Sequence, residues 1–314
     1  MTFIMRRDPQ DLYELDPAVP ELDGAPMLHH LEGFMDAGAA GRLLAEHLMT
    51  ACGQEVIARF DVDRLIDYRS RRPLMTYARD HWESYEAPEL AVRLLRDSSG
   101  TPFLLLAGPE PDHEWELFTA AVRSIADRVG AGPVIGFHGI PMGVPHTRPL
   151  GVIAHATRQE LVAGHRSMPG TVQVPGSAGA LLELRLGEAG RDALGFAVHV
   201  PHYLSQAVYP AAALALLGAV GTAAGLDLPD GELREASQRT NAEIDRQVSD
   251  SAEVAELVGA LERQYDAYAA SGGDDAGSGN GLLDGEHIPT ADELGAQFER
   301  FLAERQQRGD SPGR

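Results

Sequence analysis

The sequence predicts an α/β protein with a mostly parallel sheet and a C-terminal helical extension. Strand-like apolar runs alternate with helical patterns from residue 27 to residue 226. Residues 101–107, TPFLLLA, form an unbroken apolar run of the kind found in buried central strands. Only helical periodicity follows, over residues 227–270. Residues 27–226 are therefore expected to form one α/β domain, followed by helices.

The N-terminal region and the strands can be placed in order. Residues 1–26 contain four prolines and predict an extended arm, with regular structure beginning at Met27. A strand at 27–31 precedes a helix over 37–51 with Asp36 as its N-cap. Further strands are expected at 54–61, 101–107, 134–140, 151–156 and 195–201, extended pieces at 74–80 and 83–85, and helices at 112–129, after Ser177 and at 207–224.

The C-terminal region divides into three parts. Residues 227–270 predict a bent helical pair, 231–249 and 252–268, with a D-x-x-E capping box beginning at Asp250. Residues 271–289 form a Gly/Asp/Ser linker. A short amphipathic helix is expected over 290–306, docking on its own body or on a partner through the apolar stripe Leu294, Phe298, Phe301 and Leu302.

Charge and composition exclude several classes of function. The formal charge of −21 opposes binding to nucleic acids and to anionic membranes. All 26 basic residues are arginine, so the lysine of a Walker A loop, of a pyridoxal enzyme or of a protein kinase is absent. A GC-rich genome accounts for this arginine bias without selection for arginine chemistry.

Cysteine content and hydropathy indicate a cytoplasmic protein. The single Cys52 cannot form an internal disulfide, which fits a reducing compartment, and the N-terminus lacks the apolar core of a signal peptide. Residues 203–226 carry no charge, but Ser205, Gln206, Pro210 and many small residues favour a buried helix over a membrane span.

Polar residues gather where the expected strands end. The carboxyl edge of an open α/β sheet is where ligands bind, and carboxylates with histidines there suit acid–base chemistry or a hard cation. The alternative is structural: Asp112 caps the next helix, and Arg148 forms an ion pair in an acidic protein. The candidate pocket comprises Asp36, Glu110, Asp112, His113, His146 and Arg148.

A second candidate site lies at the start of the helix after residue 177. The stretch PGSAG resembles a nucleophile elbow only in placement, because Pro175 replaces its first glycine. Ser177 is better explained as an N-cap, with an anion site at the N–H groups of Gly176 and Ser177. No triad can be assembled, so no catalytic residue is predicted and no cofactor is required; a divalent metal stays open.

Five separated stretches resemble the PAC2 family, named after proteasome assembly chaperone 2, and its actinobacterial branch in particular. The resemblance implies a three-layer α/β/α fold similar to nucleoside phosphorylases and related hydrolases, which is often trimeric. Eukaryotic and archaeal members are assembly chaperones or assembly factors. The matching stretches are LEGFMDAGAAGRLLAEHL (31–48), FDVDRLIDYRSRRP (60–73), FLLLAGPEPDHEWELF (103–118), GIPMGVPHTRP (139–149) and PHYLSQAVYPAAALALL (201–217).

Two functional hypotheses follow. The first is a non-enzymatic homo-oligomer, a trimer by resemblance, that acts as an assembly or scaffold factor for proteasome subunits or another protein complex. It explains the missing catalytic constellation. The second is a protein that binds a small molecule or a divalent metal, or an uncharacterised enzyme on a phosphorylase-like fold. It explains why polar groups gather at the strand ends.

Overall fold

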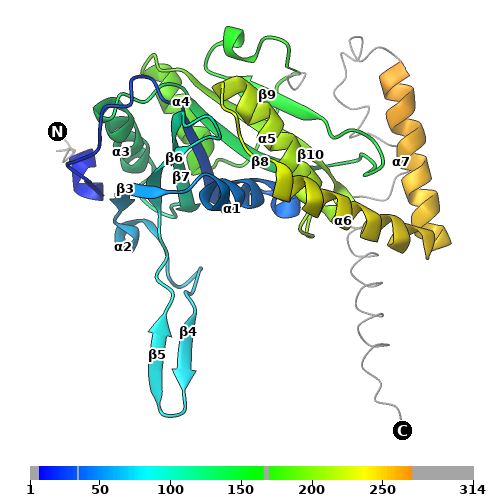
Figure 1. Ribbon diagram of the computed structural model, residues 1–314, viewed down its shortest axis with the longest axis horizontal. Helices are drawn as coiled ribbons and strands as arrows, with labels where there is room; N and C mark the ends of the chain where they lie inside the picture. The colour runs from blue at the N-terminus through cyan, green and yellow to red at the C-terminus, as the bar shows by residue number, and fades with distance from the viewer. Residues whose placement is uncertain (1–6, 34, 166–169, 271–314) are drawn as a thin grey trace.

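An eight-stranded sheet organises the computed structural model, which describes residues 7–33, 35–165 and 170–270 (Figure 1). The strand order is β1-β3-β6-β7-β2-β8-β10-β9. The four central strands β7, β2, β8 and β10 run parallel, and the strands toward both edges pair antiparallel. The predicted α/β class with a central parallel sheet is confirmed. The strands are β1 (Tyr13–Leu15), β2 (Met27–Glu32), β3 (Glu55–Phe60), β6 (Ala91–Arg96), β7 (Pro102–Pro109), β8 (Val134–Met142), β9 (Val152–Ala156) and β10 (Ala193–Pro201).

Helices cover both faces of this sheet and make the three layers. On one face lie α1 (Ala40–Ala51) and α5 (Pro210–Ala224), and on the other α3 (Trp115–Arg128) and α4 (Ala178–Glu188). Successive strand residues face opposite layers, so Leu28 packs with α1 and α5 whereas Met27 packs with α3 and α4. Short helical elements connect these layers: η1 (Pro9–Leu12), η2 (Ala37–Ala39), α2 (Val62–Leu65), η3 (Gln159–Val162) and η4 (His202–Leu204).

Most of the uncharged stretch 203–226 forms the core helix α5. Its residues Leu216 and Val220 are fully buried in the α1/α5 layer. Within the described ranges, no helix combines the length and the apolar character that crossing a membrane requires.

Two C-terminal helices extend the α5 layer. They are α6 (Gly231–Ser249) and α7 (Ala252–Ala270), in the range expected for the helical pair. Leu233 of α6 and Leu261 of α7 are buried in the same core as α5. The hydroxyl of Ser251, rather than Asp250, accepts the N–H of Val254 at 3.4 Å, so the capping position differs by one residue from the predicted box.

A two-stranded hairpin stands away from the body. Strands β4 (Met75–Ala78) and β5 (His81–Tyr85) form their own antiparallel sheet, which projects from the root near α2 (Figure 1). Every residue of β5 is exposed. The sequence predicted extended pieces here, but it did not predict that they leave the domain.

The N-terminal region differs from the expected arm. Regular structure begins at Pro9, and β1 pairs with β3 to form one edge of the sheet. Leu12 and Tyr13 are buried in the α3/α4 layer. The sequence did not predict this strand because three residues are too few to show periodicity. The surrounding prolines also suggested irregular structure, although edge strands tolerate nearby proline. The expected linker 271–289 and helix 290–306, with Leu294, Phe298, Phe301 and Leu302, lie outside the described residues.

Candidate functional site

Asp36 joins the end of β2 to α1 and β8. Its Oδ1 accepts the N–H groups of Gly41 at 2.8 Å and Gly139 at 2.9 Å, and its Oδ2 accepts that of Arg42 at 3.0 Å. The carboxylate therefore satisfies the first turn of α1, where unpaired N–H groups favour negative charge. The Nε2 of His30 lies 3.7 Å from Oδ2. The expected capping role of Asp36 is present, although the helix proper begins at Ala40.

Glu110 occupies the equivalent position at α4. Its Oε1 accepts the N–H of Ala178, the first residue of α4, at 2.6 Å. The side chain lies over Gly33, where a Cβ atom would be 2.0 Å from Oε2, so a larger residue at 33 would displace it. Ser177 caps the same helix by accepting the N–H of Ala180 at 3.1 Å. The protein's own carboxylate thus lies at the N-terminus of α4, on the N–H of Ala178, next to the anion site predicted at Gly176 and Ser177.

Asp112 holds the loop at the root of the hairpin. Its Oδ2 accepts the N–H of Asp67 at 2.7 Å, and its Oδ1 pairs with Arg71. The structural alternative for Asp112, a cap on α3, is wrong: α3 begins at Trp115 after Glu114, whose φ of 55° turns the chain without a side-chain cap. His113 is exposed beside these residues.

His146 and Arg148 bind the C-terminal helices. The His146 side chain is 2% exposed, with Nδ1 at 2.7 Å from the Tyr203 hydroxyl and Nε2 at 3.1 Å from Asp245 of α6. Burial raises the pKa of Tyr203. Arg148 donates twice to Asp266 of α7, at 2.8 Å each, which raises the pKa of Arg148. The loop between β8 and β9 is therefore fastened to both α6 and α7.

The six predicted pocket residues follow strand ends, but five of them serve local structural contacts and His113 is exposed. Asp36 and Glu110 satisfy helix N-termini, Asp112 holds a loop, and His146 and Arg148 fasten the C-terminal helices. Across residues 7–33, 35–165 and 170–270, no three His, Cys, Asp or Glu side chains are arranged to hold a metal ion. The geometry offers anchoring more readily than acid–base chemistry.

Three histidines, His29, His138 and His155, form a cluster beneath α4 that the sequence pattern did not reveal as a group. Gly136 of β8 pairs with Gly195 of β10. A Cβ at Gly136 would meet His29 Nε2 at 2.7 Å, and one at Gly195 would meet His155 Cε1 at 2.3 Å, so both glycines make room for an imidazole. Burial, with neighbouring histidines, lowers the pKa of His29 to about 3 and that of His138 to about 4. These two imidazoles are neutral at pH 7.

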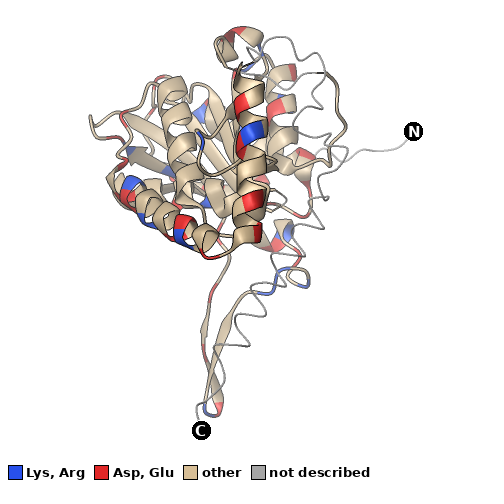
Figure 2. Ribbon diagram, turned by 90° about the vertical axis from the view of Figure 1, so that its right-hand side faces the viewer, with Lys and Arg blue, Asp and Glu red and all other residues tan. Residues whose placement is uncertain are grey.

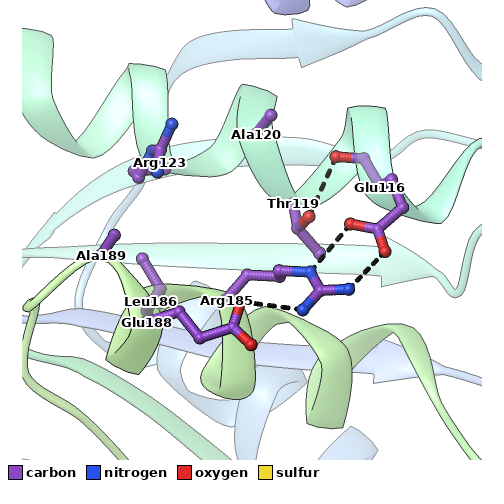
Figure 3. A pocket seen from close by; sticks show the side chains of 8 residues that line it. All are labelled: Glu116, Thr119, Ala120, Arg123, Arg185, Leu186, Glu188 and Ala189. Atoms are coloured by element: carbon purple, nitrogen blue, oxygen red, sulfur yellow. Dashed lines mark hydrogen bonds and ion pairs between the residues drawn. The ribbon is translucent and has the colours of Figure 1, made fainter.

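A surface cavity lies apart from these residues. It has a volume of about 240 Å³ and opens between α3 and α4 (Figure 3). Arg185 crosses it to reach Glu116 and Glu188. None of the six predicted pocket residues lines this cavity.

Solved structures with the same fold include actinobacterial proteins. A Mycobacterium tuberculosis protein of unknown function, Rv2714, is 51% identical with a TM-score of 0.79, over 83% of this chain and 92% of the other. A Corynebacterium glutamicum protein of unknown function is 38% identical with a TM-score of 0.79, over 83% and 98%. A proteasome-assembly chaperone homologue from M. tuberculosis, Rv2125, is 24% identical with a TM-score of 0.69, over 74% and 99%.

The family comparison agrees with these structures. No curated protein matches the chain. The model of the PAC2 family matches residues 30–248, which run from within β2 to within α6. Because this match covers more than half of its length, the chain belongs to the PAC2 family.

Proposed function

We propose that this chain is a non-enzymatic, homo-oligomeric assembly factor, with proteasome subunits as the first partners to test. The observation that carries the proposal is the filled edge of the sheet. Ligands of open α/β sheets bind beyond the carboxyl ends of the strands, often at helix N-termini. Here Asp36 and Glu110 place internal carboxylates at the N-termini of α1 and α4. This arrangement supports a structural use of the fold over phosphorylase-like catalysis.

The hairpin supports self-association. The pairs Met75–Tyr85 and Tyr77–Trp82 share one face of the ribbon, and all four side chains are about half exposed or more. Tyr77 and Trp82 touch edge to face, with ring centroids 5.1 Å apart. An isolated two-stranded hairpin is marginal in water, and an apolar face of this kind marks a protein contact. A second copy of the chain is the occupant we infer.

Charge favours the same occupant. Arg69 and Arg72 at the hairpin root and Arg79 at its turn have exposed side chains that pair with no residue in the described parts of the chain. The whole chain carries a formal charge of −21, and the charged residues of α7, which faces the viewer in Figure 2, are mostly acidic. Asp80 and Glu83 offset Arg79 on the hairpin itself, so Arg69 and Arg72 at its root are the cations that complement the acidic body of another copy. A trimer, which the family resemblance favours, is the expected assembly.

The oligomer can be tested with two matched double variants. Tyr77→Ser with Trp82→Ser removes the apolar face of the hairpin, whereas Thr76→Ala with Ser84→Ala changes its opposite face. Light scattering coupled to size exclusion should give an oligomeric mass for the wild type and the control, and one chain mass for the first variant. A monomeric wild type, or an apolar-face variant that keeps the oligomeric mass, would contradict the proposal.

A structural relative and Cys52 indicate the partner and the compartment. One structural relative is described as a proteasome-assembly chaperone homologue, which makes proteasome subunits the first partner to test. The free Cys52 is compatible with the reducing cytoplasm in which such complexes assemble. Because Asp36 and Glu110 occupy the edge of the sheet, we expect partners to bind at the hairpin and at the C-terminal helices.

A ligand-binding function is the second candidate, and one observation favours it. His202 Nε2, beyond the end of β10, and Asn241 Oδ1, on α6, are buried and have no hydrogen-bond partner. Unsatisfied buried atoms of this kind often mark a missing water or ligand. Native mass spectrometry of the purified protein tests this function: a retained metabolite or divalent metal that Asn241→Leu abolishes would support it, and the bare chain mass would oppose it.

A further inference from the structure

The cavity between α3 and α4 contains a positive charge that the fold leaves unpaired. Arg123 of α3 lines its open side with an exposed side chain, and its guanidinium makes no hydrogen bond or ion pair with any residue in 7–33, 35–165 or 170–270. Arg185 from α4 is different. It donates to both oxygens of Glu116, at 2.9 and 2.6 Å, and to Glu188 at 2.8 Å (Figure 3). Arg123 is therefore the cation left for a ligand.

The charges around Arg123 select among anions. The hydrogen bonds from Arg185 lower the pKa of Glu116, and they pair this carboxylate with α4 across the cavity. Two carboxylates and two guanidiniums make the cavity neutral as a whole. A dianion such as phosphate would add a second negative charge beside Glu116 and Glu188. One carboxylate instead matches the planar, two-pronged guanidinium of Arg123.

The uncharged lining residues and the volume of the cavity limit the size and polarity of the rest of the ligand. Ala120, Ala189 and the edge of the buried Leu186 supply the apolar part of a lining that is otherwise polar. The volume of about 240 Å³ is smaller than the roughly 300–1,000 Å³ of sites for drug-sized molecules. We propose that this cavity binds a small monocarboxylate with a short aliphatic body, whose carboxylate is held by Arg123. The proposal is independent of the assembly role.

Two sources could supply this chemistry, a free short-chain acid or the last residue of a peptide. Calorimetric titrations of the full chain with hexanoate and with a tripeptide ending in leucine should show binding. Hexanamide and the C-terminally amidated tripeptide should not bind, because they lack the charge that Arg123 recognises. The tighter of the two acids identifies the source. Failure of both acids to bind, or equal binding by the amides, would overturn the proposal.

Variants confirm the location without disturbing the fold. Arg123→Met should weaken binding at least tenfold, and Ala120→Leu should block it while keeping every charge. Arg128→Met is the matched control, because Arg128 lies on the same helix and does not line the cavity. Wild-type affinity in Arg123→Met, or an equal loss in Arg128→Met, would show that the cavity is not the site.

Discussion

At the scale of single residues, Asp36 and Glu110 act as built-in anions. Each follows a parallel strand and accepts N–H groups at the start of a helix, in the position that a phosphate or carboxylate ligand takes in related folds. Gly33 belongs to this arrangement, since any side chain there would collide with Glu110. The polar residues that mark a candidate active site in the sequence therefore hold the layers together.

The contact between Glu110 and α4 can be tested by stability. Glu110→Ala removes the acceptor for the Ala178 N–H and leaves space over Gly33. We expect the free energy of unfolding to fall by about 1–3 kcal/mol. Glu110→Gln keeps the shape and one acceptor, so its loss should be clearly smaller. Urea unfolding at pH 7 measures both, and an alanine variant as stable as the wild type would show that the contact contributes nothing.

At the scale of elements, the histidine cluster makes the joint between α4 and the sheet sensitive to acid. Both His29 and His138 have a pKa near 6.5 when exposed, against about 3 and about 4 in the fold, where burial disfavours their charged form. Between pH 6.5 and 4 the unfolded chain therefore binds more protons than the folded chain. Stability from the neutral imidazoles is fully present above pH 6.5 and falls as the pH drops, by about 1.4 kcal/mol per pH unit for each histidine.

Unfolding measured from pH 7 to pH 4.5 tests this dependence. In the variant His138→Asn, the free energy of unfolding should fall less steeply with decreasing pH, whatever the effect of the substitution on stability at pH 7. His81→Asn is the matched control, since His81 lies on the exposed hairpin outside the cluster. Equal slopes in the wild type and in His138→Asn would rule out His138 as a source of the acid sensitivity.

The sequence predicts the elements better than it predicts their contacts. The strand at β7 and the helices α6 and α7 follow from long periodic or apolar runs, whereas β1 is too short to show a pattern. The capping role of Asp36 is local and was predictable. Glu110 meets Ala178 68 positions away and His146 meets Asp245 99 positions away, so only the folded chain reveals these contacts. The apolar face of the hairpin was hidden for the same reason, because exposure is a property of the fold.

At the scale of the whole molecule, the hairpin and the helix α7 are two surfaces available for contacts with other chains. The hairpin carries aromatic side chains away from the body, while the charged residues of α7 on another side are mostly acidic (Figures 1 and 2). The loop Pro145–Pro149 fastens α6 and α7 to the domain through His146 and Arg148. A rigid body with a projecting contact element fits a protein that brings other chains together.

The measurement that tests this account most directly is a reconstitution. Proteasome α and β subunits from the same organism are purified separately and mixed with or without this protein, and native gels follow the appearance of the complete particle. The account predicts faster or fuller assembly with the wild type, and loss of that gain with Tyr77→Ser and Trp82→Ser but not with Thr76→Ala and Ser84→Ala. Assembly at the same rate and to the same yield without the protein would contradict it.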